Sequence, residues 1–369
     1  MPRTSPIAIE GPQAAGNEHV IGGIFLLAAS LCPAPCHIPP VSLAPRAAYA
    51  SSPWYNGDMP APAMTLGNRR PHFRRHDPPP LRLTADDIAI VRHVARHRFL
   101  RSTHIVRLIG RPPKKVVERL GALYHTGYLD RPRAQLDYYA TIKRPPYVYG
   151  LGNRGADLLL EIDGAERPKV DWTDKNREAG RPFIEHTLLV ADLMVALACA
   201  LHGRPDVSLI EPEQILAAAP EATRRAPAPF KFTARTEHGD LAVIPDRVFG
   251  LDFTMERKRK YFFLEADRAT MPVMRASLLQ TSMYRKFLAY AAGGAPLNAF
   301  GRQLGIGSFR VLTVSTSAER TRHMLDALQQ ATRGSRQFLF ADRTAIDTAS
   351  DLLTLPWLSG KGDRVRLLD

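Results

Sequence analysis

The 369-residue sequence predicts a protein with two unlike parts, a mostly helical first part and an α/β second part. The fold class is therefore α/β for the second part and α+β for the whole protein. Between residues 81 and 161, three segments with helical periodicity are followed by two short strand-like segments. From residue 183 onward, apolar strand-like runs alternate with helical runs, which is the pattern of an α/β domain. Hydrophobic residues make up 45% of the chain, and that share is enough for ordinary globular cores.

Changes in composition divide the chain further. We expect two folded parts, at residues 81–161 and 183–345. The remaining segments are rich in Pro, Ala or polar residues, which predicts little regular structure. They are a disordered leader at 1–64, a basic Pro-rich linker at 65–80, a second linker at 162–182 and a C-terminal tail at 346–369.

The leader contains one apolar run, VIGGIFLLAASLC, which is too short to span a membrane. The region before it is long for a signal peptide and contains Glu10 and Glu18, which argues against export. The chain has three cysteines and no pattern of a disulfide framework. We therefore expect a cytoplasmic protein without membrane contact, and a targeting segment within residues 1–64 is the alternative.

Positive charge is concentrated in one quarter of the chain. The net charge of the whole sequence is +14. From Thr65 to Gly155 there are 19 Lys or Arg against 6 Asp or Glu, which gives +13. A solvated basic surface is the plainest interpretation of a charge run, but this concentration favours a polyanionic partner.

Three helices are predicted in the basic part. The first begins at the capping-box-like run TADD (84–87), the second at Ser102 and the third at the proline pair 112–113. On a helical wheel, the third helix has an apolar arc and an opposite, mostly polar arc. The apolar arc contains Val116, Val117, Leu120, Leu123 and Tyr124. The opposite arc contains Lys114, Lys115, Glu118, Arg119, Ala122 and His125.

A basic hairpin is expected after the third helix, from the strand-like runs YLDRP and PPYVYGL. Three helices followed by a hairpin is the order of a winged helix-turn-helix, whose third helix enters the major groove. A small helical bundle with a solvated polar face is the alternative. The first interpretation predicts contacts to double-stranded DNA from Lys114, Lys115, Arg119, Arg133, Lys143 and Arg144.

The second part begins with a mostly apolar helix, FIEHTLLVADLMVALACALHG. Strands are predicted at VSLIE, LAVIPDRVFGL, KYFFLEAD, FRVLTVST and QFLF. Helices are predicted over 273–292 and 318–332, and the stretch from Glu211 to Thr233 is expected to be irregular. No Gly-rich phosphate-binding loop is present in the sequence.

Three carboxylates lie at the ends of two of these strands. Glu265 and Asp267 are two residues apart at the end of a buried strand, so both point to the same face. Asp246 ends the neighbouring apolar run, and the three could converge on one site. Two or three carboxylates around an open site suit Mg²⁺. The alternative is that they are solvated acids paired to Arg247 or Arg268.

The run IPD, a hairpin, FFLEAD and a helix with Lys286 and Tyr290 resemble the PD-(D/E)xK nuclease-like superfamily. The order of the winged helix, EHTLLVAD, PDRVFGL, FFLEADRAT, KFLAY and FRVLTVST is similar to the replication-relaxation family of plasmid and mobile-element proteins. This resemblance covers roughly residues 81–340. It implies a restriction-endonuclease-like second domain, with Asp246 and Glu265 as metal ligands.

The sequence departs from the nuclease pattern at one position. The superfamily usually has Lys two residues after the Glu, and this chain has Asp267 there. Lys286 on the next helix is the candidate to supply the missing charge. The expected catalytic residues are therefore Asp246, Glu265 and Lys286, and the expected metal ligands are Asp246, Glu265 and Asp267. Glu185 and His186 are further candidates, for an added acidic ligand and a proton shuttle.

Two functions follow from these features. The first is a DNA-binding protein of a plasmid or mobile element that acts in replication, relaxation or mobilisation. If its second domain is active, it is a Mg²⁺-dependent DNA endonuclease or nickase. The alternative is a non-catalytic winged-helix transcriptional regulator or replication accessory protein. Double-stranded DNA, replication or mobilisation proteins and a second copy of the chain are the expected partners.

Overall fold

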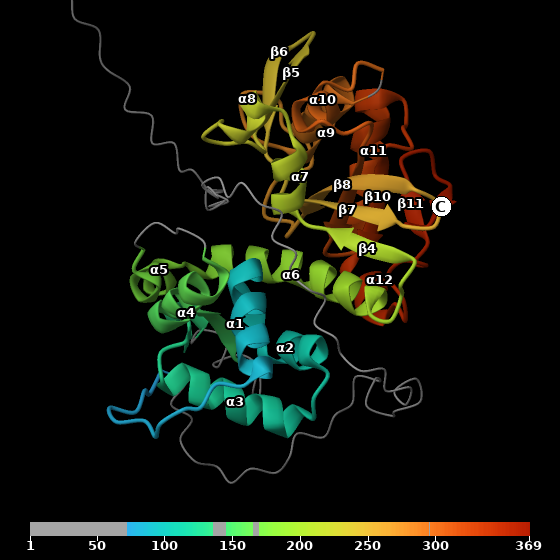
Figure 1. Cartoon of the computed structure of the whole chain (residues 1–369). Helices are drawn as coiled ribbons and strands as arrows, with labels where there is room; N and C mark the ends of the chain where they lie inside the picture. Colours follow the sequence, from blue (N-terminus) through green and yellow to red (C-terminus); the bar gives the residue numbers. More distant parts are fainter. Residues whose placement is uncertain (1–71, 136–144, 165–169, 295) are drawn as a thin grey trace, which may run out of the picture.

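The computed structural model describes residues 72–135, 145–164, 170–294 and 296–369 (Figure 1). The predicted leader 1–64 therefore lies outside the described residues, and so do Lys143 and Arg144 of the predicted hairpin loop. Within the described ranges the chain forms two units, which share one long helix (Figure 1).

The N-terminal unit has the predicted order of three helices and a hairpin. Its helices are α1 (Ala85–His97), α2 (Ser102–Ile109), α3 (Pro113–His125) and α4 (Asn153–Asp163). Its strands β1 (Phe99–Arg101), β2 (Leu129–Asp130) and β3 (Val148–Leu151) form an antiparallel sheet in the order β1-β3-β2. Thr84 caps α1 through a capping box with Asp87, as the sequence predicts.

Helix α3 buries four of the five apolar residues predicted for one arc: Val116, Leu120, Leu123 and Tyr124. The fifth, Val117, is 49% exposed. Val117 is at the edge of the apolar arc, where the surface of the helix turns toward solvent.

Residues 72–83, which we call the arm, pack along α3 and β2 although part of them was predicted as a linker. The Arg74 guanidinium donates to the Leu129 carbonyl at 3.2 Å and pairs with Asp130 at 3.2 Å. It also lies over the Tyr124 ring, 4.7 Å from the centroid. These contacts fix the arm because a planar cation can stack on an aromatic ring and bind a carboxylate at the same time.

The second unit is built on a seven-stranded sheet in the order β12-β11-β10-β9-β8-β7-β4. The central strands β8, β9 and β10 are parallel, and the strands outside them are antiparallel. The bounds are β4 (Val207–Ile210), β7 (Arg247–Phe253), β8 (Lys258–Ala266), β9 (Arg310–Ser315), β10 (Phe338–Asp342), β11 (Trp357–Ser359) and β12 (Arg364–Val365).

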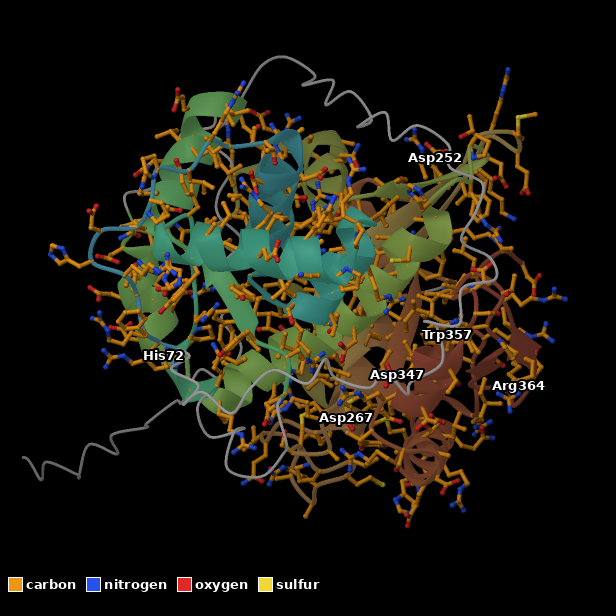
Figure 2. All side chains as sticks on the ribbon, turned by 90° about the horizontal axis from the view of Figure 1, so that it is seen from below. His72, Asp252, Asp267, Asp347, Trp357 and Arg364 are labelled. Carbon is orange, nitrogen blue, oxygen red and sulfur yellow. The ribbon has the colours of Figure 1, made fainter. Side chains whose placement is uncertain are left out.

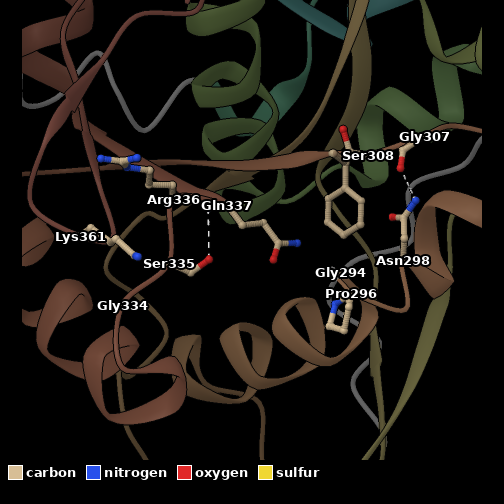
Figure 3. Close-up of a pocket in the computed structure, with 11 residues that line it drawn as sticks. Gly294, Pro296, Asn298, Gly307, Ser308, Gly334, Ser335, Arg336, Gln337 and Lys361 are labelled. Atoms are coloured by element: carbon tan, nitrogen blue, oxygen red, sulfur yellow. Dashed lines mark hydrogen bonds between the residues drawn. The ribbon is translucent and has the colours of Figure 1, made fainter.

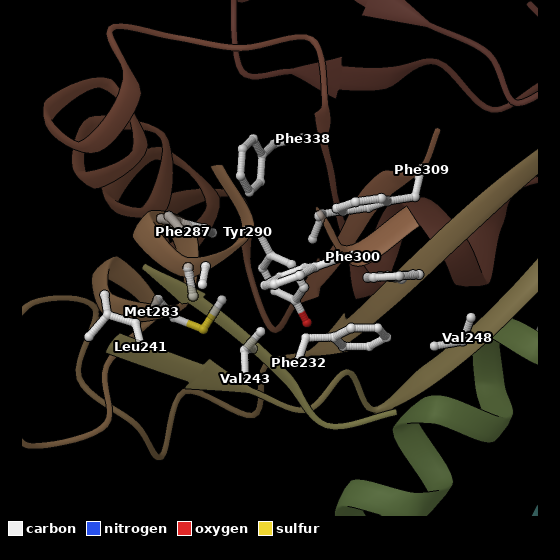
Figure 4. Close-up of a cluster of buried hydrophobic side chains, with 14 of the residues drawn as sticks. Phe232, Leu241, Val243, Val248, Met283, Phe287, Tyr290, Phe300, Phe309 and Phe338 are labelled. Atoms are coloured by element: carbon white, nitrogen blue, oxygen red, sulfur yellow. The ribbon is translucent and has the colours of Figure 1, made fainter. Parts of the chain in front are cut away.

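Helices cover both faces of this sheet. On one face lie α9 (Met283–Gly293), α10 (Ala299–Leu304), α11 (Ala318–Thr332) and the hairpin β5 (Phe232–Thr236)–β6 (Gly239–Val243). Aromatic side chains fill the space between them, and Phe232, Tyr290, Phe300 and Phe309 pack together in Figure 4. On the other face lie α6 (Arg181–Leu201) and α12 (Arg343–Thr348).

Helix α6 contributes to the cores of both units. Leu193 and Leu197 pack against the sheet, whereas Ala191 and Val195 complete the core of the N-terminal unit. Among the described residues, α6 is the one helix long and apolar enough to cross a membrane, and half of its most apolar stretch is buried. Contact with two cores explains this composition, because a helix buried on opposite sides needs apolar residues on both.

The structure corrects several predicted boundaries. Residues 162–182 contain helix α5 (Trp172–Glu178), whose Trp172 and Asn176 are buried. Residues 346–369 are not a tail, because β11 and β12 extend the sheet and Trp357 is fully buried. The expected irregular stretch 211–233 contains α7 (Pro212–Ala218) and α8 (Glu221–Arg224). The helix expected over 273–292 begins only at Met283, where Ser282 caps it.

Candidate functional site: a buried carboxylate cluster

Asp246 and Glu265 lie side by side at the junction of β7 and β8. Asp246 immediately precedes β7, and its backbone NH donates to the Leu264 carbonyl at 2.9 Å. Its Oδ2 accepts a hydrogen bond of 2.7 Å from the Ala266 backbone NH. These two bonds hold Asp246 beside Glu265, the penultimate residue of β8. The predicted convergence of these two carboxylates is therefore present in the structure.

Glu265 is 2% exposed, and two side chains from α9 bind it. The Lys286 ammonium donates to Glu265 Oε2 at 2.5 Å, and the Tyr290 hydroxyl donates to Oε1 at 2.5 Å. Lys286 and Tyr290 are four residues apart and so lie on one face of α9. Lys286 thus binds Glu265, the acid that is usually followed two residues later by a lysine in the PD-(D/E)xK superfamily. In this chain Asp267 occupies the position of that lysine.

His186 of α6 completes this group, and its Nε2 is 3.1 Å from Asp246 Oδ1. Its side chain is 35% exposed, compared with 14% for Asp246 and 17% for Lys286. Solvent therefore reaches the group mainly past His186. We call His186, Asp246, Glu265, Lys286 and Tyr290 the carboxylate cluster.

Burial and the neighbouring charges shift the titration of the cluster. Burial, together with the charge of Asp246, raises the pKa of Glu265 to about 7 although Lys286 and Tyr290 oppose the shift. Burial would lower the pKa of Lys286, but the charges of Glu265 and Asp246 raise it to about 12. Against the effect of burial, Lys286 and His186 lower the pKa of Asp246, and Asp246 raises the pKa of His186.

Asp267 does not join the cluster. Its carboxylate accepts hydrogen bonds from Arg320 of α11, at 2.9 Å from Nε and 3.0 Å from Nη2, and its side chain is 2% exposed. Within the part of the chain that is described, no three His, Cys, Asp or Glu side chains are grouped to hold a metal ion. The three-carboxylate site predicted from the sequence is therefore not formed.

The acids are not the solvated strand-end residues of the alternative prediction either, because Glu265 and Asp267 are buried. Arg268 binds Glu185 at 2.6 Å, and Arg247 binds Glu211 at 2.8 Å. Glu185 thus pairs with an arginine rather than adding a ligand to the cluster. The sequence did not indicate that Arg320 would bind Asp267. Arg320 lies in the first turn of α11, which follows β9, and β9 is the parallel neighbour of β8.

Comparison with known families now places the chain. The family model described as replication-relaxation matches residues 91–295. The chain belongs to the replication-relaxation family. The matched span runs from α1 to α9 and includes all five residues of the carboxylate cluster. No curated protein and no solved structure matches the chain. Membership supports a role in the replication or relaxation of mobile elements, with DNA and the replication machinery as partners.

The carboxylate cluster of this replication-relaxation protein fits Mg²⁺ in donor type. Asp246 and Glu265 offer carboxylate oxygens from adjacent positions, and Mg²⁺ is often held by one or two protein carboxylates. In the structure all four of these oxygens already have protein partners: His186, Ala266, Lys286 and Tyr290. A metal ion at this place therefore competes with the Lys286 ammonium for Glu265.

The predicted DNA-contacting residues lie in different settings. Lys114 and Lys115, in the first turn of α3, are exposed and have no ion-pair partner among the described residues. Arg133 is also exposed. Arg119, in contrast, binds the buried Asp87 carboxylate through Nε at 2.9 Å and through Nη2. Figure 2, seen from below, shows α3 in teal across the front of the N-terminal unit, with side chains projecting from it.

A separate hollow of about 500 Å³ lies at the opposite end of the parallel strands. The segments that precede β9 and β10 line it, and so does Lys361 (Figure 3). Cluster residues do not line this hollow, since Glu265 is at the carboxyl end of its strand.

Proposed function

We propose that this replication-relaxation protein binds duplex DNA through its N-terminal unit, with α3 as the contacting helix. The observation that carries the proposal is the pair Lys114 and Lys115, two exposed cations without a carboxylate partner in the described ranges, at the start of α3. The order of three helices and a hairpin supports it, because a winged helix-turn-helix presents its third helix to the major groove. The concentration of basic residues from Thr65 to Gly155 adds the electrostatic attraction that phosphates require.

The test is duplex affinity as a function of salt. The double variant Lys114→Glu/Lys115→Glu is compared with Arg257→Glu/Lys258→Glu, which reverses two exposed neighbouring cations at the end of the turn before β8 and at the first residue of β8. We expect the first variant to weaken binding at least tenfold and to lower the slope of log affinity against log salt by about two. The control should keep the slope of the wild type. Equal losses in both variants would show that only the overall charge matters and would remove α3 as the contact.

Metal-dependent DNA cleavage is the second candidate, and the meeting of Asp246, Glu265 and Lys286 in one cluster favours it. Asp246 and Glu265 would hold Mg²⁺, which supplies charge for phosphoryl transfer when it is bound. Lys286 places a positive charge beside the same oxygens, of the kind that stabilises charge developing on a phosphate. The resemblance to the PD-(D/E)xK superfamily implies the same three residues.

Cleavage of supercoiled plasmid, with and without Mg²⁺, tests this second candidate. Asp246→Asn and Glu265→Gln should each abolish cleavage and leave duplex affinity unchanged, because neither residue is near α3. Calorimetry of the wild type with Mg²⁺ alone measures the metal site separately. Metal binding without cleavage, or neither, would leave the non-catalytic regulator or accessory protein as the function.

A further inference from the structure

The arm runs antiparallel to the C-terminal half of α3. At one end, the Arg75 backbone NH donates to His125 Nδ1 at 3.3 Å, beside the last turn of α3. Farther along, the Arg82 carbonyl accepts a hydrogen bond of 3.1 Å from Arg119 in the middle of the helix. In both contacts the arm uses its backbone, so the side chains of Arg75 and Arg82 are not needed to hold it in place.

Those two side chains are exposed, and neither has an ion-pair partner in the parts of the chain that are described. Arg75 lies near the end of α3, and Lys114 and Lys115 lie at its start. The 13 residues of α3 span about 20 Å at 1.5 Å per residue. The exposed acids Asp77 and Glu118 share this surface and leave it with a net positive charge.

Arg119 has a different environment, because its charge is already neutralised. It binds the carboxylate of Asp87, which is 0% exposed, and its bond to the Arg82 carbonyl joins the arm to the same group. Asp87 in turn caps α1 through Thr84. Arg119 therefore links α3, α1 and the arm.

We infer that the arm is part of the DNA-contacting surface, with Arg75 and Arg82 binding phosphates of a duplex, and that Arg119 positions the arm instead of contacting DNA. The inference rests on the proposed function, since it extends the surface that begins with Lys114 and Lys115. A row of cations about 20 Å long matches about six base pairs at 3.4 Å each. Without the arm, the exposed lysines of α3 would contact phosphates only near the start of the helix.

The experiment measures the affinity of the full chain for a 20-base-pair duplex over a range of salt concentrations. Arg75→Gln and Arg82→Gln should each reduce the slope of log affinity against log salt by about one, with an unchanged melting temperature. Arg119→Gln should lower the melting temperature, because it leaves the buried Asp87 without its partner, and should keep the slope, because Arg74 and the Arg75 backbone still hold the arm on the N-terminal unit. Arg257→Gln is the control for the loss of one exposed cation elsewhere.

The outcomes separate the inference from the proposed function. If Lys114→Glu/Lys115→Glu lowers the slope while Arg75→Gln and Arg82→Gln do not, the arm is not a contact and α3 still is. If none of these variants lowers it, both proposals are wrong. A lower slope for Arg119→Gln at an unchanged melting temperature would overturn its positioning role. Tighter binding to an RNA duplex of the same sequence would overturn DNA as the partner.

Discussion

At the scale of single residues, Glu265 is a buried acid with a pKa of about 7, so its ionisation makes stability depend on pH. The folded chain binds a proton at Glu265 more tightly than the unfolded chain, in which the pKa is about 4.5. The contribution of Glu265 to stability therefore falls as pH rises from 4.5 to 7, by up to about 3 kcal/mol. The raised pKa of His186 acts in the same direction above pH 6.5. The lowered pKa of Asp246 acts below pH 3.8, outside this window.

The first prediction is that the stability of the wild type, measured relative to that of Glu265→Gln, falls between pH 5.5 and pH 8; His93, His97 and His104, whose pKa values burial lowers, act in the opposite direction in both proteins. Glu265→Gln should remove the contribution of Glu265, because an amide does not ionise; its oxygen can still accept a hydrogen bond from Lys286, and its NH2 group can donate to the Tyr290 hydroxyl. Urea midpoints at the two pH values provide the measurement. Parallel pH profiles for the wild type and the variant would mean that Glu265 titrates normally.

The second prediction concerns Lys286→Met, which removes the ammonium and keeps a similar volume. Glu265 and Asp246 would then be buried without their cation, which should cost about 3–5 kcal/mol at pH 8. The cost should be smaller at pH 5.5, because Glu265 is protonated there. Chemical unfolding at both pH values measures it, and an equal loss at the two values would contradict the electrostatic explanation.

Sequence alone predicted part of this site. The strand pattern suggested that Asp246 lies near Glu265, and the resemblance to the nuclease-like superfamily pointed to Lys286 on the next helix. The pattern of alternating side chains also placed Asp267 on the face of Glu265, but it could not show that Arg320 of α11 binds the Asp267 carboxylate. Arg119 was assigned to the polar face of α3 because a helical wheel does not include Asp87, which lies on another helix.

At the scale of elements, α6 joins the two units through its opposite faces. Leu188 packs with Phe99 and Val148 on the side of the N-terminal unit, and Leu193 packs on the sheet. The sequence predicted the helix and its apolar character. It did not predict that one helix would belong to two cores, because a uniformly apolar pattern does not identify the partners of each face.

The third prediction is that the units unfold together. Leu188→Ala and Leu193→Ala should each cost about 2–5 kcal/mol and should each shift one cooperative transition. Thermal unfolding followed by circular dichroism and by tryptophan fluorescence provides the test, since Trp172 and Trp357 report on different units. Two separate transitions, with only one moved by Leu188→Ala, would show that the units are independent.

At the scale of the whole molecule, Asp192 of α6 forms ion pairs with both units, in addition to the apolar contacts that α6 makes with them. It binds Arg101 and His104 from the N-terminal unit, the latter at 2.7 Å, and Arg343 from the second unit at 3.3 Å. Its side chain is 10% exposed. One acid therefore neutralises cations from both units, which no local sequence pattern indicates because the partners are distant along the chain.

The fourth prediction follows from that position. Asp192→Asn should lower the free energy of unfolding by about 3 kcal/mol, because Arg101 and His104 lose their carboxylate partner and Arg343 keeps only Asp347, 3.6 Å away. Arg343→Gln in the Asp192→Asn background should recover part of the loss, and a double-mutant cycle measures this coupling. Simple additivity of the two changes would show that Asp192 does not connect the units.

The shared helix α6 also bears on how such a protein can exchange parts by genetic recombination. A crossover before α6 would join the N-terminal unit of one parent to the α6 helix of the other parent. Ala191 and Val195 of that helix would then pack against a core for which they were not selected. A crossover after α6 would create the same mismatch on the side of Leu193 and Leu197, against the sheet. Hybrids with either junction should lose solubility unless substitutions on the matching face of α6 accompany the exchange. An exchange that keeps the protein folded should therefore carry both units together with α6, even though each unit has its own sheet.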